Sequence, residues 1–245
     1  MESMDIIVPA ILVETLAELE EKLERVSGLT GTIQIDVVDG IFASPPTWPY
    51  VHSEDMRDFK QSVNDGKIFS NSSQPILEVD LMVSSPEEIV AMWVALGASR
   101  ITIHAKSVDN LSDTFRRLSE TFGSGKNFST DMLLFGVALG SEDDISILEP
   151  VLDKIDYVQC MGIRNIGKQG EPFDDSVIDK VSVLHTKYPD MPVQVDGGVS
   201  FLTAPKLLSA GASRIIIGSA IWYSTDIKER IKEFQDLSLR YGLYT

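Results

Sequence analysis

The sequence predicts an α/β protein with a (β/α)8 barrel, the TIM-barrel fold. Short apolar runs rich in β-branched residues alternate with helical patterns about eight times along the 245 residues. This length suits one barrel, and no low-complexity tract or change of composition marks a linker, so we expect one domain over residues 1–245. An open doubly wound sheet would require a glycine-rich turn after the first strand, and Pro9–Leu12 does not provide one.

The strands are expected where short apolar runs are bounded by polar or turn-forming residues. In the second run, Gln34, Asp36 and Val38 alternate with isoleucine and valine, so these three side chains share one face of the strand. The eight expected strands are Ile6–Leu12, Gly31–Val38, Ile76–Val83, Arg100–His104, Met132–Leu139, Tyr157–Met161, Val193–Val195 and Ile215–Ile217.

Helices are expected between the strands, where apolar residues recur every three or four positions. Leu16, Leu19 and Leu23 have this spacing in the first helix, and Pro86 suits the first turn of another. The expected helices are Glu14–Arg25, Ser53–Val63, Pro86–Leu96, Asn110–Phe122, Glu142–Leu152, Asp174–Tyr188, Leu202–Ala210 and Asp226–Tyr241. The longer connections are a proline-rich loop over Asp39–Pro49, a connector over Gly123–Thr130 and a polar loop over Gly162–Pro172.

Charge and cysteine content exclude several classes of protein. Acidic residues outnumber basic ones by 37 to 21, and the net charge of −16 argues against a nucleic-acid partner, which requires a basic surface. Cys160 is the one cysteine, so no internal disulfide can form and a reducing compartment fits. Met1–Asp5 lacks the basic start of a signal peptide, and the apolar run Ile6–Val13 is too short to span a bilayer. We expect a cytoplasmic protein without a membrane partner.

Barrel enzymes carry their active-site residues at the carboxyl ends of the strands. The stretch Pro192–Val199 contains the most informative of these ends, where Asp196 is followed at once by Gly197 and Gly198. Two glycines allow backbone N–H groups to come close to an anion. Taken alone, these residues are also compatible with a turn whose acid caps the next helix. Other strand ends carry polar residues as well, namely Gln34, Asp36, Asp39, Asp80 and His104.

At these strand ends the chain resembles the ribulose-phosphate 3-epimerase family, over nearly its whole length. Each matching stretch is short, but all occur in order and at the spacing of the family. They are Pro9–Leu12, Ile35–Gly40, Leu81–Val83, Pro86–Glu87, Gly97–Ala98, Gly136–Leu139, Val195–Val199, Ala210–Ala212 and Gly218–Ile221.

The resemblance implies a barrel of the ribulose-phosphate-binding type and an isomerase of carbohydrate metabolism, in the pentose phosphate reactions. Family members move the C3 proton of D-ribulose 5-phosphate through an enediolate to give D-xylulose 5-phosphate. Two aspartates act as acid and base, and they match Asp36 and Asp196 here. Methionines that cap the reaction intermediate match Met82 and Met161, although the residues alone favour ordinary barrel core at these positions.

The resemblance also implies a divalent metal, held in the family by two histidines and two aspartates. In this chain Gln34 and Asp80 stand at the histidine positions, beside Asp36 and Asp196. Such an all-oxygen set suits Mg²⁺ or Mn²⁺ better than zinc or iron. Without a metal, three clustered aspartates would repel one another and at least one would titrate high. The two alternatives are therefore a hard cation or a site that has lost its metal.

The sequence also predicts a phosphate-binding part of the site. Backbone donors and a helix N-terminus follow two strands, and the loop over 162–173 corresponds to the glycine-rich phosphate lid of the family. Arg164 or Lys168 in this loop could offset the acidic field of the protein, although both are also compatible with plain solvent exposure. The residues expected to bind phosphate are Gly167, Gly170, Gly197, Gly198, Gly218 and Ser219.

Three functions remain open at this point. The first is an epimerase acting on D-ribulose 5-phosphate or a related ketose phosphate. The second is a sugar-phosphate-binding protein without epimerase activity, which the lost histidines and Ala10, at a position where the family has serine, would explain. The third is another enolate reaction, such as decarboxylation or aldol chemistry, for which Lys106 is the one comparable lysine. Family members are commonly dimers or larger, so a homo-oligomer is possible, but no stretch of the sequence indicates an interface and the oligomeric state stays open.

Overall fold

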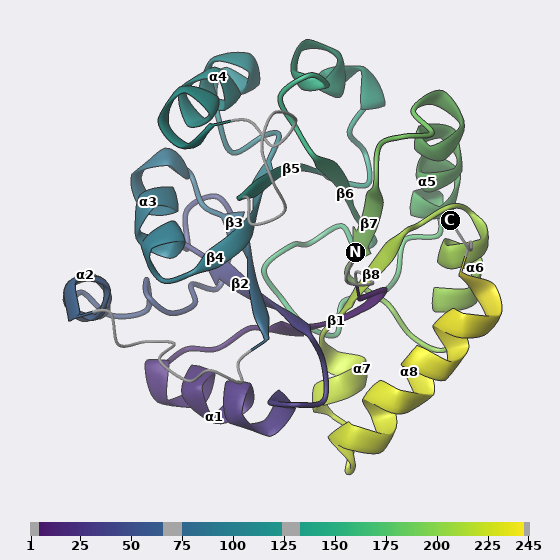
Figure 1. Cartoon of the computed structure of the whole chain (residues 1–245), viewed down its shortest axis with the longest axis horizontal. Helices are drawn as coiled ribbons and strands as arrows, with labels where there is room; N and C mark the ends of the chain where they lie inside the picture. The colour runs from purple at the N-terminus through teal and green to yellow at the C-terminus, as the bar shows by residue number, and fades with distance from the viewer. Residues whose placement is uncertain (1–4, 66–74, 124–132, 243–245) are drawn as a thin grey trace.

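The computed structural model describes residues 5–65, 75–123 and 133–242. Eight parallel strands close into a barrel in sequence order, and β1 pairs with both β2 and β8. Figure 1, viewed down the barrel, shows the strands around the centre and the helices in an outer ring. This is the (β/α)8 architecture that the sequence predicts.

The observed strands lie within two residues of the expected bounds. They are β1 Ile7–Ile11, β2 Thr32–Val38, β3 Ile76–Met82, β4 Ala98–His104, β5 Leu134–Leu139, β6 Tyr157–Met161, β7 Val193–Asp196 and β8 Arg214–Ile217. The helices are α1 Leu16–Val26, α2 Asp55–Asp65, α3 Glu87–Ala95, α4 Leu111–Phe122, η2 Ile145–Val151, α5 Ser176–Lys187, α6 Ala204–Ser209, α7 Ser219–Trp222 and α8 Ile227–Tyr241. Residues 124–130 of the expected connector, and the first residue of the strand expected over 132–139, lie outside the described residues.

One expected helix has a different form. The sequence predicts an α-helix over 142–152, whereas the chain forms the 3₁₀ helix η2 over Ile145–Val151. Pro150 lies inside this segment and has no N–H to donate, so a regular α-helical ladder cannot continue through it. The Asp144 side chain caps the start by accepting a hydrogen bond from the Ser146 N–H at 2.8 Å. The α-helix prediction is therefore wrong over 142–152, because Pro150 interrupts the hydrogen-bond ladder that it requires.

The first helix illustrates why the outer ring forms. The Thr15 hydroxyl accepts a hydrogen bond from the Glu18 N–H at 3.2 Å, which satisfies one of the unpaired donors at the start of α1. Leu19, Leu23 and Val26 lie one helical turn apart and are buried against the strands. The helices thus cover the outer face of the barrel with apolar contacts, as in other barrels of this kind.

Strand register brings the polar strand ends into one layer inside the barrel. Asp36 on β2 pairs with Asp80 on β3, and Asp196 on β7 pairs with Met161 on β6. Because side chains alternate along a strand, the residues two positions earlier, Gln34 among them, form the next layer down. The closed barrel therefore gathers side chains that lie far apart in the sequence.

The lower part of the barrel interior carries a buried ion cluster. Glu78 on β3 pairs with Arg100 on β4 at 2.9 Å and with Arg214 on β8 at 2.5 Å, and none of the three residues is more than 5% exposed. The Arg100 guanidinium also stacks 3.8 Å from the centre of the Tyr157 ring. Gly136 leaves room for this ring, since a Cβ there would lie 2.2 Å from it. This interior differs from the apolar filling usual in such barrels.

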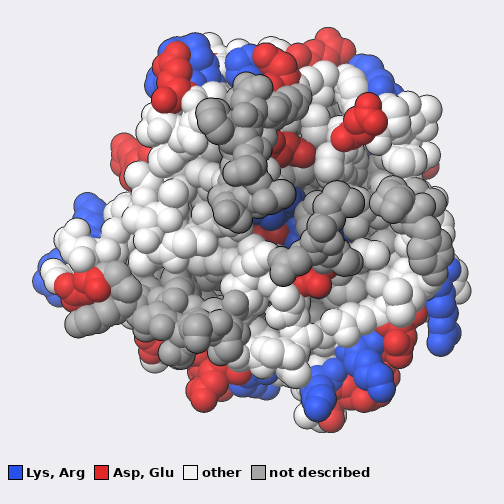
Figure 2. Space-filling view, viewed as in Figure 1, with Lys and Arg blue, Asp and Glu red and all other residues white. Residues whose placement is uncertain are grey.

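The outer surface carries charges of both signs. Figure 2, from the same side as Figure 1, shows Lys and Arg interspersed with Asp and Glu around the rim. Arg117 on α4, for example, pairs with Asp113 at 2.7 Å and with Glu87 at 2.6 Å. Exposed pairs of this kind each contribute little to stability. None of the helices in the described ranges is long and apolar enough to cross a membrane.

The buried cluster predicts a large stability effect. Glu78→Gln would leave two buried guanidinium groups without their carboxylate, at a cost of about 3–5 kcal/mol in the free energy of unfolding. Urea unfolding followed by circular dichroism measures this change. The control is Asp175→Asn, which breaks an exposed pair with Lys206 and should cost less than about 1 kcal/mol. Equal effects of the two substitutions would contradict a stabilising role for the buried cluster.

Candidate active site

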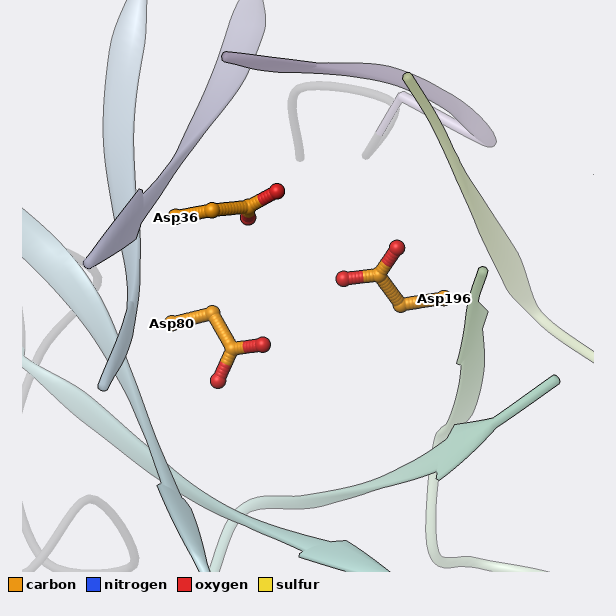
Figure 3. A group of neighbouring side chains, drawn as sticks. All are labelled: Asp36, Asp80 and Asp196. Atoms are coloured by element: carbon orange, nitrogen blue, oxygen red, sulfur yellow. The ribbon is translucent and has the colours of Figure 1, made fainter. Parts of the chain in front are cut away.

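Three buried carboxylates lie together at the carboxyl end of the barrel. Asp36, Asp80 and Asp196 each offer an oxygen within 4.8 Å of the others, and none is more than 8% exposed. Figure 3 shows Asp36 and Asp80 pointing from one side of the barrel towards Asp196 on the other side. The site thus has two walls, formed by β2 and β3 and by β7.

Gln34 connects the two walls. Its Nε2 donates to Asp36 Oδ1 at 2.9 Å and to Asp196 Oδ2 at 2.8 Å. Its Oε1 is buried and has no hydrogen-bond partner among the described residues. The four residues predicted as a metal-ligand set therefore meet in one place.

Asp80 is held by two donors that the sequence prediction did not connect with it. His104 Nε2 lies 3.0 Å from Asp80 Oδ1, and Gln159 Nε2 donates to Asp80 Oδ2 at 2.9 Å. Sequence reasoning named His104 only as a strand-end residue and missed Gln159. Gln159 lies two positions before Met161 and so faces the barrel interior, a spacing that would have identified it.

Burial and mutual repulsion change the acidity of the site. Burial, together with the neighbouring charges of Asp196 and Asp80, raises the pKa of Asp36 well above its usual range. Burial and the Asp80 carboxylate raise the pKa of Asp196 to about 7, against a smaller opposing effect of the Gln34 hydrogen bond. Removing a carboxylate from water and placing it near like charges both favour its protonated form. Near neutral pH this pair of residues is therefore suited to exchanging a proton with a bound molecule.

A pocket opens directly above the carboxylates. Asp36 and Asp196 line it together with Met82 and Met161, which are each 2% exposed. The remaining lining includes every residue predicted to bind phosphate, namely Gly167, Gly170, Gly197, Gly198, Gly218 and Ser219. The structure thus brings the predicted carboxylates, methionines and glycines to the same cavity.

The glycine pair after β7 is required by the packing of its surroundings. Gly197 and Gly198 have φ of +98° and +67°, which residues with a side chain rarely adopt. A Cβ on Gly197 would lie 2.7 Å from Ile163, and one on Gly198 would lie 2.8 Å from Phe173. Both neighbours belong to the loop after β6, so the glycines allow that loop to close against the strand end.

The cations near the site have different surroundings. Lys168 lines the pocket, and it forms no ion pair within the described part of the chain. Arg164 instead points to acids beside the loop, Asp174 at 2.8 Å and Glu142 at 3.7 Å. Lys106 forms an ion pair with Asp143, its side chain is 66% exposed, and it is not among the residues that line the pocket. Of the two cations that the sequence offered for an anionic substrate, Lys168 is the one at the pocket.

Several solved structures share the fold of this chain at low sequence identity. KGPDC from Streptococcus mutans gives a TM-score of 0.66 with 16% identity, over 96% of this chain and 97% of that one. The 3-hexulose-6-phosphate synthase of Salmonella typhimurium gives 0.65 with 14% identity, over 97% and 100% of the two chains. At this identity the likeness shows the fold alone.

Sequence relatives identify the family. The chain is 26% identical over 239 residues to the ribulose-phosphate 3-epimerase of Bacillus subtilis (strain 168), covering 94% of this chain and 97% of that protein. It is 30% identical over 239 residues to the chloroplastic ribulose-5-phosphate-3-epimerase of Arabidopsis thaliana, covering 93% and 75%. Residues 6–222 match the pattern described as the ribulose-phosphate 3 epimerase family. The chain belongs to the ribulose-phosphate 3 epimerase family.

Proposed function

We propose that this protein epimerises a ketose phosphate at C3, with D-ribulose 5-phosphate and D-xylulose 5-phosphate as its reactant pair. The observation that carries the proposal is the placement of Asp36 and Asp196 on opposite walls of one pocket. Inversion of a carbon centre through a planar intermediate requires a proton to leave on one face and return on the other. Two carboxyl groups that face each other across the substrate meet this requirement.

One of the two carboxyl groups would act as the catalytic base and the other as the catalytic acid. One must be ionised to take the C3 proton and the other must be protonated to return one. Their raised pKa values make such a mixed state accessible near neutral pH. The Gln34 amide donates to both groups and so bridges them without supplying a proton. Met82 and Met161 would exclude water from the reacting carbon.

The residues around Gln34 fit a divalent cation. The orphaned Oε1 of Gln34 and the oxygens of Asp36, Asp80 and Asp196 form a set of oxygen donors, which suits Mg²⁺ or Mn²⁺. Both amide ends of Gln34 have the same shape, so a turn of the amide plane can present Oε1 to an ion. A bound cation would supply positive charge beside the substrate oxygen that becomes negative in the reaction.

The phosphate group would lie at the other end of the pocket. Gly197, Gly198 and the Gly218–Ser219 turn at the start of α7 line this end and can offer backbone N–H groups. Lys168 adds a positive charge in a protein whose net charge is −16. Lys106, already paired with Asp143 and outside this pocket, lends no support to the alternative enolate reactions.

Isotope exchange tests the proposed reaction. The protein is incubated with D-ribulose 5-phosphate in deuterated water with Mg²⁺, Mn²⁺ or Zn²⁺, and deuterium at C3 is followed by NMR. Asp36→Asn and Asp196→Asn should each lower the rate about 10²–10⁴-fold, because each removes one proton-transfer group. The exposed Asp175→Asn serves as the control and should retain the wild-type rate.

The same experiment separates the epimerase from a binding protein. Absence of C3 exchange with all three metals would reject the pentulose reaction. If D-ribulose 5-phosphate then still bound, and bound equally well to Asp36→Asn, the protein would be a sugar-phosphate-binding member of the family.

Removal of metal should make stability depend on pH. Asp36 and Asp196 bind protons more tightly in the folded chain than in the unfolded one, where the ordinary value is 3.8. Their stabilising contributions are complete below that value, and the contribution of Asp196 is lost as pH rises through about 7. In EDTA, the urea midpoint should therefore fall between about pH 5 and about pH 8. Asp196→Asn should flatten this dependence.

Addition of Mn²⁺ at about pH 8 should raise the urea midpoint of the metal-free protein, because a cation that binds only the folded chain stabilises it. A urea midpoint that changes neither with pH nor on addition of Mn²⁺ would contradict the clustered-carboxylate site. Asp196→Asn removes one proposed ligand and should reduce the gain from Mn²⁺.

The role of Lys168 predicts a selective effect on substrate binding. Lys168→Met should raise KM about tenfold or more with little change in kcat, because the charge acts on a phosphate remote from C3. Arg164→Met is the matched control from the same loop and should leave both constants unchanged, since Arg164 is paired with Asp174 and Glu142. Steady-state kinetics in both variants measure this, and a larger effect of Arg164→Met would reverse the assignment.

A further inference from the structure

A continuous chain of hydrogen bonds runs inside the barrel from the buried ion cluster to the carboxylate site. Arg100 Nη2 and Arg214 Nη1 donate to Gln194 Oε1 at 3.0 and 3.2 Å. Gln194 Nε2 donates to Gln159 Oε1 at 2.7 Å, and Gln159 Nε2 donates to Asp80 Oδ2 at 2.9 Å. These five residues are each at most 5% exposed, so water cannot replace a lost partner easily.

The two arginines determine the direction of every bond in this chain. A guanidinium group has donors and no acceptor, so the end of the Gln194 amide that faces it must be the oxygen. The nitrogen of Gln194 then faces Gln159, which must present its own oxygen. The nitrogen of Gln159 is consequently turned towards Asp80. Both amide orientations thus follow from the fixed chemistry of arginine, although the two ends of an amide have the same shape.

We propose that Arg100, Arg214, Gln194 and Gln159 form a positioning relay that holds the Asp80 carboxylate for use as a ligand of a hard divalent cation. The inference rests on the proposed function, because it assumes a cation at the Asp36, Asp80 and Asp196 site. Asp80 receives a donor on one oxygen from Gln159, while His104 Nε2 lies against the other. Partners of this kind fix the orientation of metal ligands, and their loss typically lowers metal affinity 10–100-fold.

Repulsion between neighbouring carboxylates explains why Asp80 requires partners that hold it in place. Asp80 lies within reach of two other carboxylates, and like charges at this distance favour turning one of them away. Gln159 opposes this rotation only while its nitrogen faces Asp80. If the Gln159 amide turned over, its oxygen would face the carboxylate and repel it. Gln194 therefore acts on Asp80 at a distance, through the orientation of Gln159.

The decisive variant is Gln194→Glu, which keeps the shape of the side chain and removes its donor. The introduced carboxylate faces Arg100 and Arg214, which favour its ionised form, and the two arginine charges then balance those of Glu78 and the new carboxylate. It can only accept a hydrogen bond from Gln159, so the Gln159 amide must turn over and present its oxygen to Asp80. We expect the dissociation constant of Mn²⁺, measured by electron paramagnetic resonance on the metal-free full chain, to rise at least tenfold.

A double-variant cycle tests whether the two glutamines act in series. Gln159→Leu should weaken Mn²⁺ binding as Gln194→Glu does, and the double variant should be no weaker than Gln159→Leu alone. Thr114→Val is the control: it removes a buried hydroxyl on α4 that donates to Glu87 Oε1 at 2.9 Å and lies outside the relay. It should change the urea midpoint and leave Mn²⁺ affinity at the wild-type level.

The outcomes separate the relay from the metal site itself. Wild-type protein that binds no Mn²⁺ would overturn the proposed metal-assisted function and this inference with it. Wild-type binding that Gln194→Glu leaves unchanged would overturn the relay alone, and so would additive effects of the two glutamine substitutions. Circular dichroism verifies that each variant is folded. If Gln159→Leu does not fold, the isosteric Gln194→Glu still decides the question.

Discussion

Polar side chains fill much of the interior of this barrel and are almost completely buried, so most of their donors and acceptors depend on other side chains. Glu78 pairs with Arg100 and Arg214, the two arginines orient Gln194, and Gln194 in turn orients Gln159 against Asp80. An apolar barrel core would be indifferent to such matching. In this barrel, a buried donor or acceptor that loses its partner in the ion cluster changes the orientation of the side chains between that cluster and the carboxylate site.

Burial also determines the charge state of the carboxylate site. Three carboxylates held within 4.8 Å of one another in a buried layer cannot all remain ionised without compensation. A proton or a cation supplies this compensation, and both suit a reaction in which a proton moves and negative charge develops on oxygen. In the proposed metal site, Gln34 and the three aspartates would offer oxygen donors only.

The end of the pocket proposed for phosphate is formed mainly by turns of the backbone rather than by charged side chains. Backbone groups of glycine-containing turns face the place proposed for phosphate, and close packing of the loop after β6 holds these turns in their unusual conformations. A single side-chain cation, Lys168, joins them among the residues lining the pocket. Asp39, another acid at a strand end, has a structural task, since it accepts hydrogen bonds from the backbone N–H groups of Ile41, Phe42 and Ser84. Acidic strand ends thus serve both chemistry and loop structure.

The sequence by itself determined the barrel, because the alternation of strands and helices depends on local periodicity. Resemblance to a family through short motifs at strand ends indicated most residues of the candidate site, but not Gln159. The sequence also indicated which residues share a strand face, as with Gln34 and Asp36. It did not determine which strand ends meet or what holds them: the contact of Gln34 with Asp196 spans 162 positions and exists only in the closed barrel. The pairing of Asp80 with Gln159, the choice between Lys168 and Arg164, and the 3₁₀ form of η2 were likewise decided by packing and by hydrogen-bond partners distant in the chain. Strand register and closure of the barrel bring distant residues together and are properties of the tertiary structure. The orientation of a buried amide depends on both.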